Sequence, residues 1–176
     1  MVRRRRYSVI AALLISAIVS VAIAVAYLSL VGSRGEGSSS REAASTYVGD
    51  LEIKLINGTV IKLSEFRGRK VILDFWATWC KPCLRQLEVF RVFTREHPDI
   101  VVISISVELG VEKVRRFIER YGYTWLFAID EGYRLSKYFG VRFIPTLVVI
   151  DEDCRVKRIL VGLHELEDLE RIVYGT

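Results

Sequence analysis

From residue 47 onward, short apolar runs alternate with stretches in which apolar residues recur every three or four positions. Apolar runs bounded by turn residues predict buried strands, which begin at Val71, Ile100, Trp125 and Pro145, with a further strand that ends at Val161. The longer spacing predicts helices over 83–96, 111–121, 131–139 and 164–174. Strands that alternate with helices, followed by a final hairpin and helix, predict an α/β fold.

The first 31 residues follow a different pattern. Four arginines at 3–6 precede residues 7–31, which contain no charge. At 1.5 Å per helical residue this run can cross the ~30 Å core of a membrane. Residues 1–31 are therefore predicted to be a cytoplasmic basic stub and one transmembrane anchor of a single-pass cell-membrane protein. The alternative is a signal peptide cleaved after Ala24-Val25-Ala26. In both cases the arginines remain in the cytoplasm and the rest of the chain lies outside.

Residues 32–46 are small, polar and rich in glycine and serine, which predicts a flexible linker. One domain of ordinary size then covers 47–176. Near its start, the apolar stretches 51–56 and 59–63 flank Asn57-Gly58, the strongest short signal for a β-hairpin. The domain is therefore predicted to begin with a hairpin, ahead of the first buried strand.

The formal net charge of +5 raises the question of a nucleic-acid partner. The arginines at 3–6 and Arg34 supply all of it, because the other 21 lysines and arginines equal in number the 21 aspartates and glutamates. From residue 35 onward the positive and negative charges are therefore equal in number. The positive charge is therefore a signal of membrane topology, and no nucleic-acid binding is predicted.

The most informative stretch is 71–83, V-I-L-D-F-W-A-T-W-C-K-P-C, in which a buried strand leads into C-x-x-C at the start of a helix. Residues three apart on a helix share a face, so the sulfurs of Cys80 and Cys83 can form a disulfide. The helix N-terminus favours a thiolate at Cys80, and Pro82 fits in the first turn. This predicts a redox pair with Cys80 as nucleophile and Cys83 as resolving thiol. The alternative is a purely structural disulfide.

Other candidate metal ligands are few. His97 and His164 stand singly and far apart, and there is no second close cysteine pair, so neither a metal nor another cofactor is predicted. Cys154 lies in a predicted turn at 151–154. A simple turn residue is favoured over a reactive sensor, because no neighbouring group activates its thiol.

The segment 74–83, D-F-W-A-T-W-C-K-P-C, resembles the active-site segment of the thioredoxin superfamily, and Ile144-Pro145-Thr146 resembles its later proline motif. The predicted hairpin and residues 63–70 resemble the membrane-anchored TlpA/ResA-like branch. The resemblance covers roughly 48–174. It implies a thioredoxin-like α/β fold with an N-terminal β-hairpin addition, here preceded by the predicted transmembrane helix.

The resemblance also implies roles for two carboxylates. Asp74 matches the buried aspartate that accepts a proton from the resolving cysteine, although TlpA/ResA-like proteins often have asparagine there. Glu108 matches an active-site glutamate of that branch after a one-residue shift; the alternative is a plain surface residue. Two positions depart from the family pattern: Glu88 replaces a helix-kinking proline, and Gln86 stands where the branch often has glutamate. The first helix is therefore expected to be straighter.

Substrate contacts follow from the same comparison. Pro145 matches the cis-proline that faces the C-x-x-C motif, which implies that the backbone of Ile144 is exposed for β-like pairing with a substrate segment. Trp79 is predicted to be the apolar contact beside Cys80, and Trp76 the packed one.

The predicted protein is an extracytoplasmic, membrane-tethered thiol–disulfide oxidoreductase whose thiolate attacks a client disulfide. The resemblance implies a reductant of client proteins such as apocytochrome c, recharged by a membrane electron carrier. An oxidising or isomerising protein is the alternative, because Lys81 favours a thiolate and a more oxidising pair, whereas Asp74 opposes this. A metal-delivery binding module is a different class, but copper carriers of this fold use C-x-x-x-C with a placed histidine.

Overall fold

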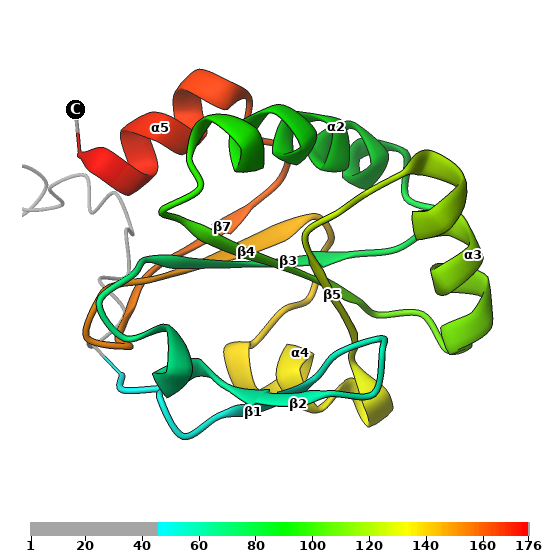
Figure 1. The fold of residues 1–176 in the computed structure, drawn as a ribbon, viewed down its shortest axis with the longest axis horizontal. Helices are drawn as coiled ribbons and strands as arrows, with labels where there is room; N and C mark the ends of the chain where they lie inside the picture. Colours follow the sequence, from blue (N-terminus) through cyan, green and yellow to red (C-terminus); the bar gives the residue numbers. More distant parts are fainter. Residues whose placement is uncertain (1–45, 176) are drawn as a thin grey trace, which may run out of the picture. The chain divides into compact units, whose positions relative to one another are not determined.

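A five-stranded mixed sheet forms the centre of the chain in the computed structural model, which describes residues 46–175 (Figure 1). Its strand order is β5-β4-β3-β6-β7. The strands are β3 (Val71–Trp76), β4 (Val101–Ser106), β5 (Leu126–Ile129), β6 (Thr146–Ile150) and β7 (Val156–Val161). β3, β4 and β5 run parallel, whereas β6 and β7 are antiparallel to their neighbours. β3 lies in the middle with every residue buried, which explains why all its residues except Asp74 are apolar.

Within residues 46–175, four α-helices accompany the sheet. They are α2 (Lys81–Glu96), α3 (Val111–Tyr121), α4 (Arg134–Phe139) and α5 (Leu166–Tyr174). Figure 1 shows α2 and α5 on one side of the sheet, with α4 and the N-terminal hairpin on the other.

Side-chain alternation along β3 decides which side each residue faces. Val71, Leu73 and Phe75 pack with the hairpin and α4. Ile72 packs with residues of α2 and α5, and Trp76 packs with residues of α2 and α3. Asp74 lies between Ile72 and Trp76 in this alternation, so its carboxyl faces the side covered by α2.

The predicted N-terminal hairpin is present, but its register differs by one residue from that implied by a two-residue Asn57-Gly58 turn. β1 (Glu52–Lys54) pairs with β2 (Val60–Lys62), and Leu55 N–H donates to Thr59 O. The loop therefore has three residues, with Gly58 in the left-handed region at φ 90°. Leu55 also bridges to Ala128, which docks the hairpin on the edge strand β5. Leu63, predicted to end the second strand, instead begins a 3-10 helix, Leu63–Phe66.

Two helices differ from the predicted ranges. The stretch 131–139 is divided into a 3-10 turn, Glu131–Tyr133, and α4, because Gly132 and Tyr133 have positive φ values. The buried carboxylate of Asp130 then accepts from the first backbone N–H groups of α4. α5 begins at Leu166 and not at His164. α3 agrees with its predicted range. α2 begins at Lys81, two residues before the predicted range, which places Pro82 in its first turn as predicted, and it runs through Glu88 as one helix to Glu96.

The predicted N-terminal anchor, 1–31, lies outside the described residues, as does the linker up to residue 45. Within 46–175, no helix combines the length and apolar character that crossing a membrane requires.

Candidate active site

The N-terminus of α2 holds the two cysteines of the C-x-x-C motif. Cys80 is the N-cap residue, and its sulfur accepts the backbone N–H of Cys83 at 3.3 Å. A disulfide joins the two residues, with an S–S distance of 2.07 Å and Cα atoms 5.2 Å apart. Cys83 is fully buried, whereas Cys80 keeps 6% of its surface exposed. Solvent therefore reaches the pair at Cys80, where a helix N-terminus stabilises a thiolate.

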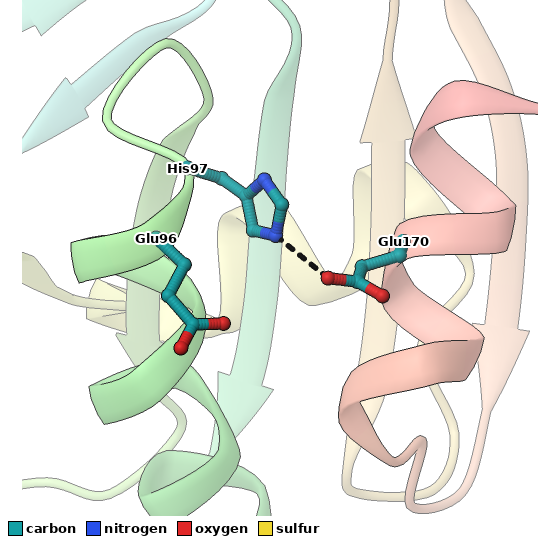
Figure 2. Close-up of side chains that lie close together, drawn as sticks. All are labelled: Glu96, His97 and Glu170. Atoms are coloured by element: carbon teal, nitrogen blue, oxygen red, sulfur yellow. Dashed lines mark hydrogen bonds and ion pairs between the residues drawn. The ribbon is translucent and has the colours of Figure 1, made fainter.

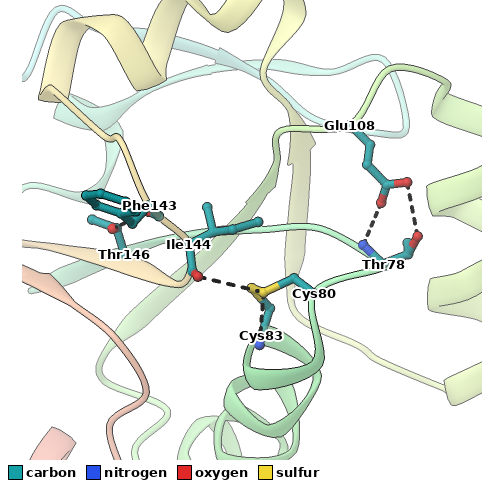
Figure 3. The surroundings of a disulfide bond; sticks show 7 residues. All are labelled: Thr78, Cys80, Cys83, Glu108, Phe143, Ile144 and Thr146. Carbon is teal, nitrogen blue, oxygen red and sulfur yellow. Dashed lines mark hydrogen bonds between the residues drawn. A yellow bond between two sulfur atoms is a disulfide. The ribbon is translucent and has the colours of Figure 1, made fainter.

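The loop before β6 faces Cys80 (Figure 3). The carbonyl oxygen of Ile144 lies 3.8 Å from Cys80 Sγ. A disulfide sulfur carries no proton, so this is a van der Waals contact in the oxidised state, and a reduced thiol could donate there. The Ile144–Pro145 peptide is cis, as predicted. Thr146 Oγ1 donates to Phe143 O at 2.6 Å, and Gly162 N–H donates to Pro145 O at 2.8 Å, which fixes the loop at both ends.

Two large apolar side chains, one beside the cysteine pair and one in the loop that faces it, remain exposed. Trp79, next to Cys80, is 65% exposed, and Phe143, next to Ile144, is 70% exposed. Exposed aromatic surface beside a reactive group is typical of a site that binds a protein segment. Trp79 was predicted as an apolar contact, and Trp76 is fully buried, as predicted. The exposure of the Phe143 side chain was not predicted, because a position two residues before a proline does not indicate whether a side chain is buried.

Glu108 is buried and not a plain surface residue, which removes that alternative. Its carboxylate accepts from Thr78 N–H at 2.5 Å and Thr78 Oγ1 at 3.0 Å (Figure 3). It also pairs with Lys113 at 2.5 Å. Burial would raise the pKa of Glu108, but the hydrogen bonds from Lys113 and Thr78 together outweigh it and leave the pKa lowered. Glu108 thus stays ionised and ties the loop before Cys80 to the end of β4.

Asp74 is fully buried in β3. Its Oδ2 accepts from Ser104 Oγ at 3.0 Å, while its Oδ1 has no hydrogen-bond partner within residues 46–175. Burial raises the pKa of Asp74 to about 7, and the Ser104 hydrogen bond opposes that rise. A carboxyl that exchanges its proton near neutral pH can act as a general acid or base.

The two departures from the family pattern have structural consequences. Gln86 is fully buried and pairs with the backbone of His164: its Nε2 donates to His164 O, and its Oε1 accepts from His164 N–H. An ionised glutamate at this position could not donate to the His164 carbonyl. Glu88 accepts from Tyr123 Oη at 2.8 Å and pairs with Arg91 at 2.9 Å. Both residues therefore anchor α2 to neighbouring segments, and nothing in their local sequence indicated these partners.

Cys154 is buried and lies in the predicted turn, where its N–H donates to Asp151 O. Its thiol contacts Leu63 O at 3.6 Å, and its φ is 60°. The structure places it, buried, beside the start of the 3-10 helix that follows the hairpin, in agreement with the interpretation as a turn residue.

A polar group that the sequence did not reveal joins the C-terminal end of α2 to α5 (Figure 2). Glu96, His97 and Glu170 bring potential metal-ligand atoms within 4.8 Å of one another. His97 Nε2 lies 3.0 Å from Glu170 Oε1, and Nδ1 lies 3.1 Å from Tyr174 Oη. Both ring nitrogens therefore have hydrogen-bond partners, and we interpret the group as hydrogen bonds that hold the two helices together.

A thioredoxin-like sheet with a C-x-x-C disulfide at a helix N-terminus, facing a cis-proline loop, defines a thiol–disulfide redox enzyme of the thioredoxin superfamily. Residues 44–172 match the Redoxin family, and the chain belongs to it, within the TlpA/ResA-like group.

Similar proteins agree with this assignment. The thiol-disulfide oxidoreductase ResA of Geobacillus kaustophilus is 34% identical over 127 residues, which cover 69% of this chain and 71% of the relative. The thioredoxin-like protein YneN of Bacillus subtilis is 30% identical over 126 residues, covering 69% and 74%.

Solved structures show the same fold. StoA from Bacillus subtilis matches with a TM-score of 0.61 and 27% identity, covering 68% of this chain and 92% of StoA. A thiol:disulfide interchange protein from Chlorobium tepidum matches with a TM-score of 0.67 and 21% identity, covering 76% and 97%.

Proposed function

We propose that this protein is a membrane-tethered, extracytoplasmic reductant of disulfides in client proteins. The observation that carries the proposal is the Cys80–Cys83 disulfide at the N-terminus of α2, in contact with the Ile144–Pro145 loop. A sulfur that receives a helix N–H and is reachable from solvent suits nucleophilic attack.

In the proposed cycle, the Cys80 thiolate attacks a client disulfide and forms a mixed disulfide, releasing one client thiolate. The Cys83 thiolate then attacks Cys80 Sγ, which closes the enzyme disulfide and releases the second client thiolate. Asp74, buried on the α2 side of β3, accepts the proton of Cys83 for this second step. Glu108 holds the Thr78 loop in position, and Trp79, Phe143 and the Ile144 backbone receive the client segment.

The location and clients are part of the proposal. The arginines at 3–6 and the uncharged residues 7–31 support an anchor with a cytoplasmic N-terminus. The similarity to ResA supports clients that carry thiols or disulfides. Apocytochrome c, whose haem-attachment motif C-x-x-C-H can oxidise to a disulfide, is the proposed client, and a membrane electron carrier recharges the pair.

Trapping in cells tests this proposal. Cys83→Ala leaves a nucleophile that has no resolving partner, so mixed disulfides with clients should accumulate and disappear on reduction. Cys80→Ala should accumulate almost none. Cys154→Ala, which changes a buried cysteine away from the pair, is the matched control and should leave trapping by Cys83→Ala unaffected.

Non-reducing gels and identification of the trapped proteins decide the outcome. Extracytoplasmic clients enriched in C-x-x-C-H motifs support the proposal. Equal trapping by both cysteine variants would refute the assigned roles, and cytoplasmic clients would refute the location.

A further inference from the structure

A line of three hydrogen-bonded side chains runs from the residue before β5, through β4, to Asp74 in β3. Trp125, immediately before the edge strand β5, donates its Nε1–H to Ser104 Oγ at 3.0 Å. Ser104, in β4, donates to Asp74 Oδ2 in β3 at 3.0 Å. Asp74 and Ser104 are direct register partners in the parallel β3–β4 pair, and both are fully buried.

The hydrogen-bonding capacity of each group determines which atom donates and which accepts. An indole nitrogen only donates, so the Ser104 oxygen must be the acceptor from Trp125. The single hydroxyl hydrogen of Ser104 is then available for Asp74 Oδ2. These are the two hydrogen bonds of this hydroxyl within residues 46–175. A proton on Oδ2 would compete with that hydrogen and leave the Ser104 hydroxyl without an acceptor in a buried place, which is costly.

We propose that Ser104 and Trp125 are positioning residues that keep Asp74 Oδ2 as a hydrogen-bond acceptor and reserve Oδ1 as the atom that takes up the proton. Oδ1 is buried and has no hydrogen-bond partner in the described part of the chain, so it is available for this task. The inference rests on the proposed role of Asp74 in resolution.

Among the residues that α2 buries, Cys83 is the one with a titratable side chain. The buried residues of α2 are Cys83, Gln86, Leu87, Phe90 and Phe93. The register partner of Asp74 in β6 is Leu147, and its partner in β4 is Ser104. None of these side chains is a permanent charge, so the hydroxyl of Ser104 is the group that stabilises the ionised carboxylate. The pKa of about 7 fits this balance, since burial raises it and Ser104 lowers it.

The resolving step transfers one proton to Asp74 and one electron pair to the client sulfur. The Cys83 S–H bond breaks, and its proton moves to Asp74 Oδ1, which becomes a neutral carboxyl. The Cys83 sulfur attacks Cys80 Sγ of the mixed disulfide, the bond between Cys80 and the client sulfur breaks, and the client sulfur leaves as a thiolate with the electron pair. Cys80 and Cys83 are oxidised to a disulfide, and the client disulfide is reduced.

The test measures the pKa of Asp74 directly. The carboxyl carbon of Asp74 is titrated by ¹³C NMR in the oxidised full chain in detergent, where Cys83 carries no proton, and Asp74→Asn identifies the resonance. Ser104→Ala should raise the pKa of Asp74 by about one pH unit or more, because a hydrogen bond to the ionised form is lost. Release of the client from the mixed disulfide should then slow about fivefold at pH 7 and recover by pH 9.

Two further variants keep the test specific. Ser106→Ala makes the same change two residues along the same face of β4, at a buried serine whose oxygen accepts from Glu108 N–H. It should leave the pKa of Asp74 unchanged. Trp125→Phe keeps the aromatic packing against Tyr123 and Phe127 but removes the indole donor. It should raise the pKa less than Ser104→Ala does, because Ser104 becomes a weaker donor.

An unchanged pKa in Ser104→Ala would overturn the proposal, and an equal rise in Ser106→Ala would show a nonspecific effect on the strand and overturn it as well. If Ser104→Ala does not fold, Trp125→Phe alone decides, and an unchanged pKa there counts against the proposal. Unchanged client release in Asp74→Asn would instead refute the role of Asp74 in the proposed function. The pKa shift in Ser104→Ala would stand in that case, since NMR reads the carboxyl itself.

Discussion

Two buried carboxylates near the redox pair, Asp74 and Glu108, have opposite surroundings. Asp74 accepts one hydrogen bond from a neutral hydroxyl, and its second oxygen has no partner within residues 46–175. Glu108 accepts two hydrogen bonds from Thr78 and one from the ammonium group of Lys113. Burial acts in the same direction on both groups, so the number and charge of the donors decide the sign of each pKa shift.

Asp74 can exchange a proton near neutral pH, whereas Glu108 stabilises the local structure. With a pKa of about 7, Asp74 is partly protonated at neutral pH, which suits proton transfer during resolution. With a lowered pKa, Glu108 remains ionised and serves as an acceptor for the Thr78 loop. We therefore expect substitutions of the two residues to change stability in opposite directions.

The largest expected effect is a gain in stability on Asp74→Asn. The pKa of Asp74 is raised in the folded state from an ordinary 3.8 to about 7, so the folded state binds the extra proton. Wild-type stability should therefore fall as the pH rises from about 4 to 7, while the variant lacks this loss. Above pH 7 the variant should be more stable by up to about 4 kcal/mol, with the difference closing near pH 4. Denaturant unfolding of the oxidised protein from pH 4 to 9 measures this, and parallel curves would contradict it.

A smaller loss is expected for Glu108→Ala. The backbone N–H of Thr78 would lose its buried acceptor, which costs about 1–3 kcal/mol at pH 7. Because the pKa of Glu108 is lowered in the folded state, its contribution is present at neutral pH and is lost as the pH falls through that pKa. Glu112→Ala is the matched control: Glu112 is an exposed glutamate paired with Arg115, and its loss should cost little. A similar cost for both variants would show that Thr78 does not depend on Glu108.

The smallest expected effect is that of Lys113→Met, which separates the ion pair from the loop contacts. The Lys113 side chain is 59% exposed, so its loss should cost less than about 1 kcal/mol and depend on salt. Glu108 would keep both hydrogen bonds from Thr78. Unfolding at low and high salt checks this, and a cost equal to that of Glu108→Ala would assign the stabilisation to the ion pair.

Features that depend on near neighbours in the chain could be predicted. The bounds of α3, the end of α2 at Glu96 and the proximity of Cys80 and Cys83 follow from spacing and from residues that end helices. The cis peptide at Pro145 followed from the family resemblance. The hairpin register did not follow, because the loop length depends on the positive φ of Gly58 and on docking against β5.

The sequence by itself determined the α/β class, the redox motif and the presence of a lone acidic residue in a buried strand. Only the tertiary structure decided the chemistry of that residue, because its partner Ser104 lies 30 residues away and meets it through the register of β3 and β4. The same holds for Glu108 with Thr78 and for Gln86 with His164, which lie 30 and 78 residues apart. Hydrogen bonds between such distant residues depend on how strands align and helices pack. Spacing along the chain does not specify these arrangements.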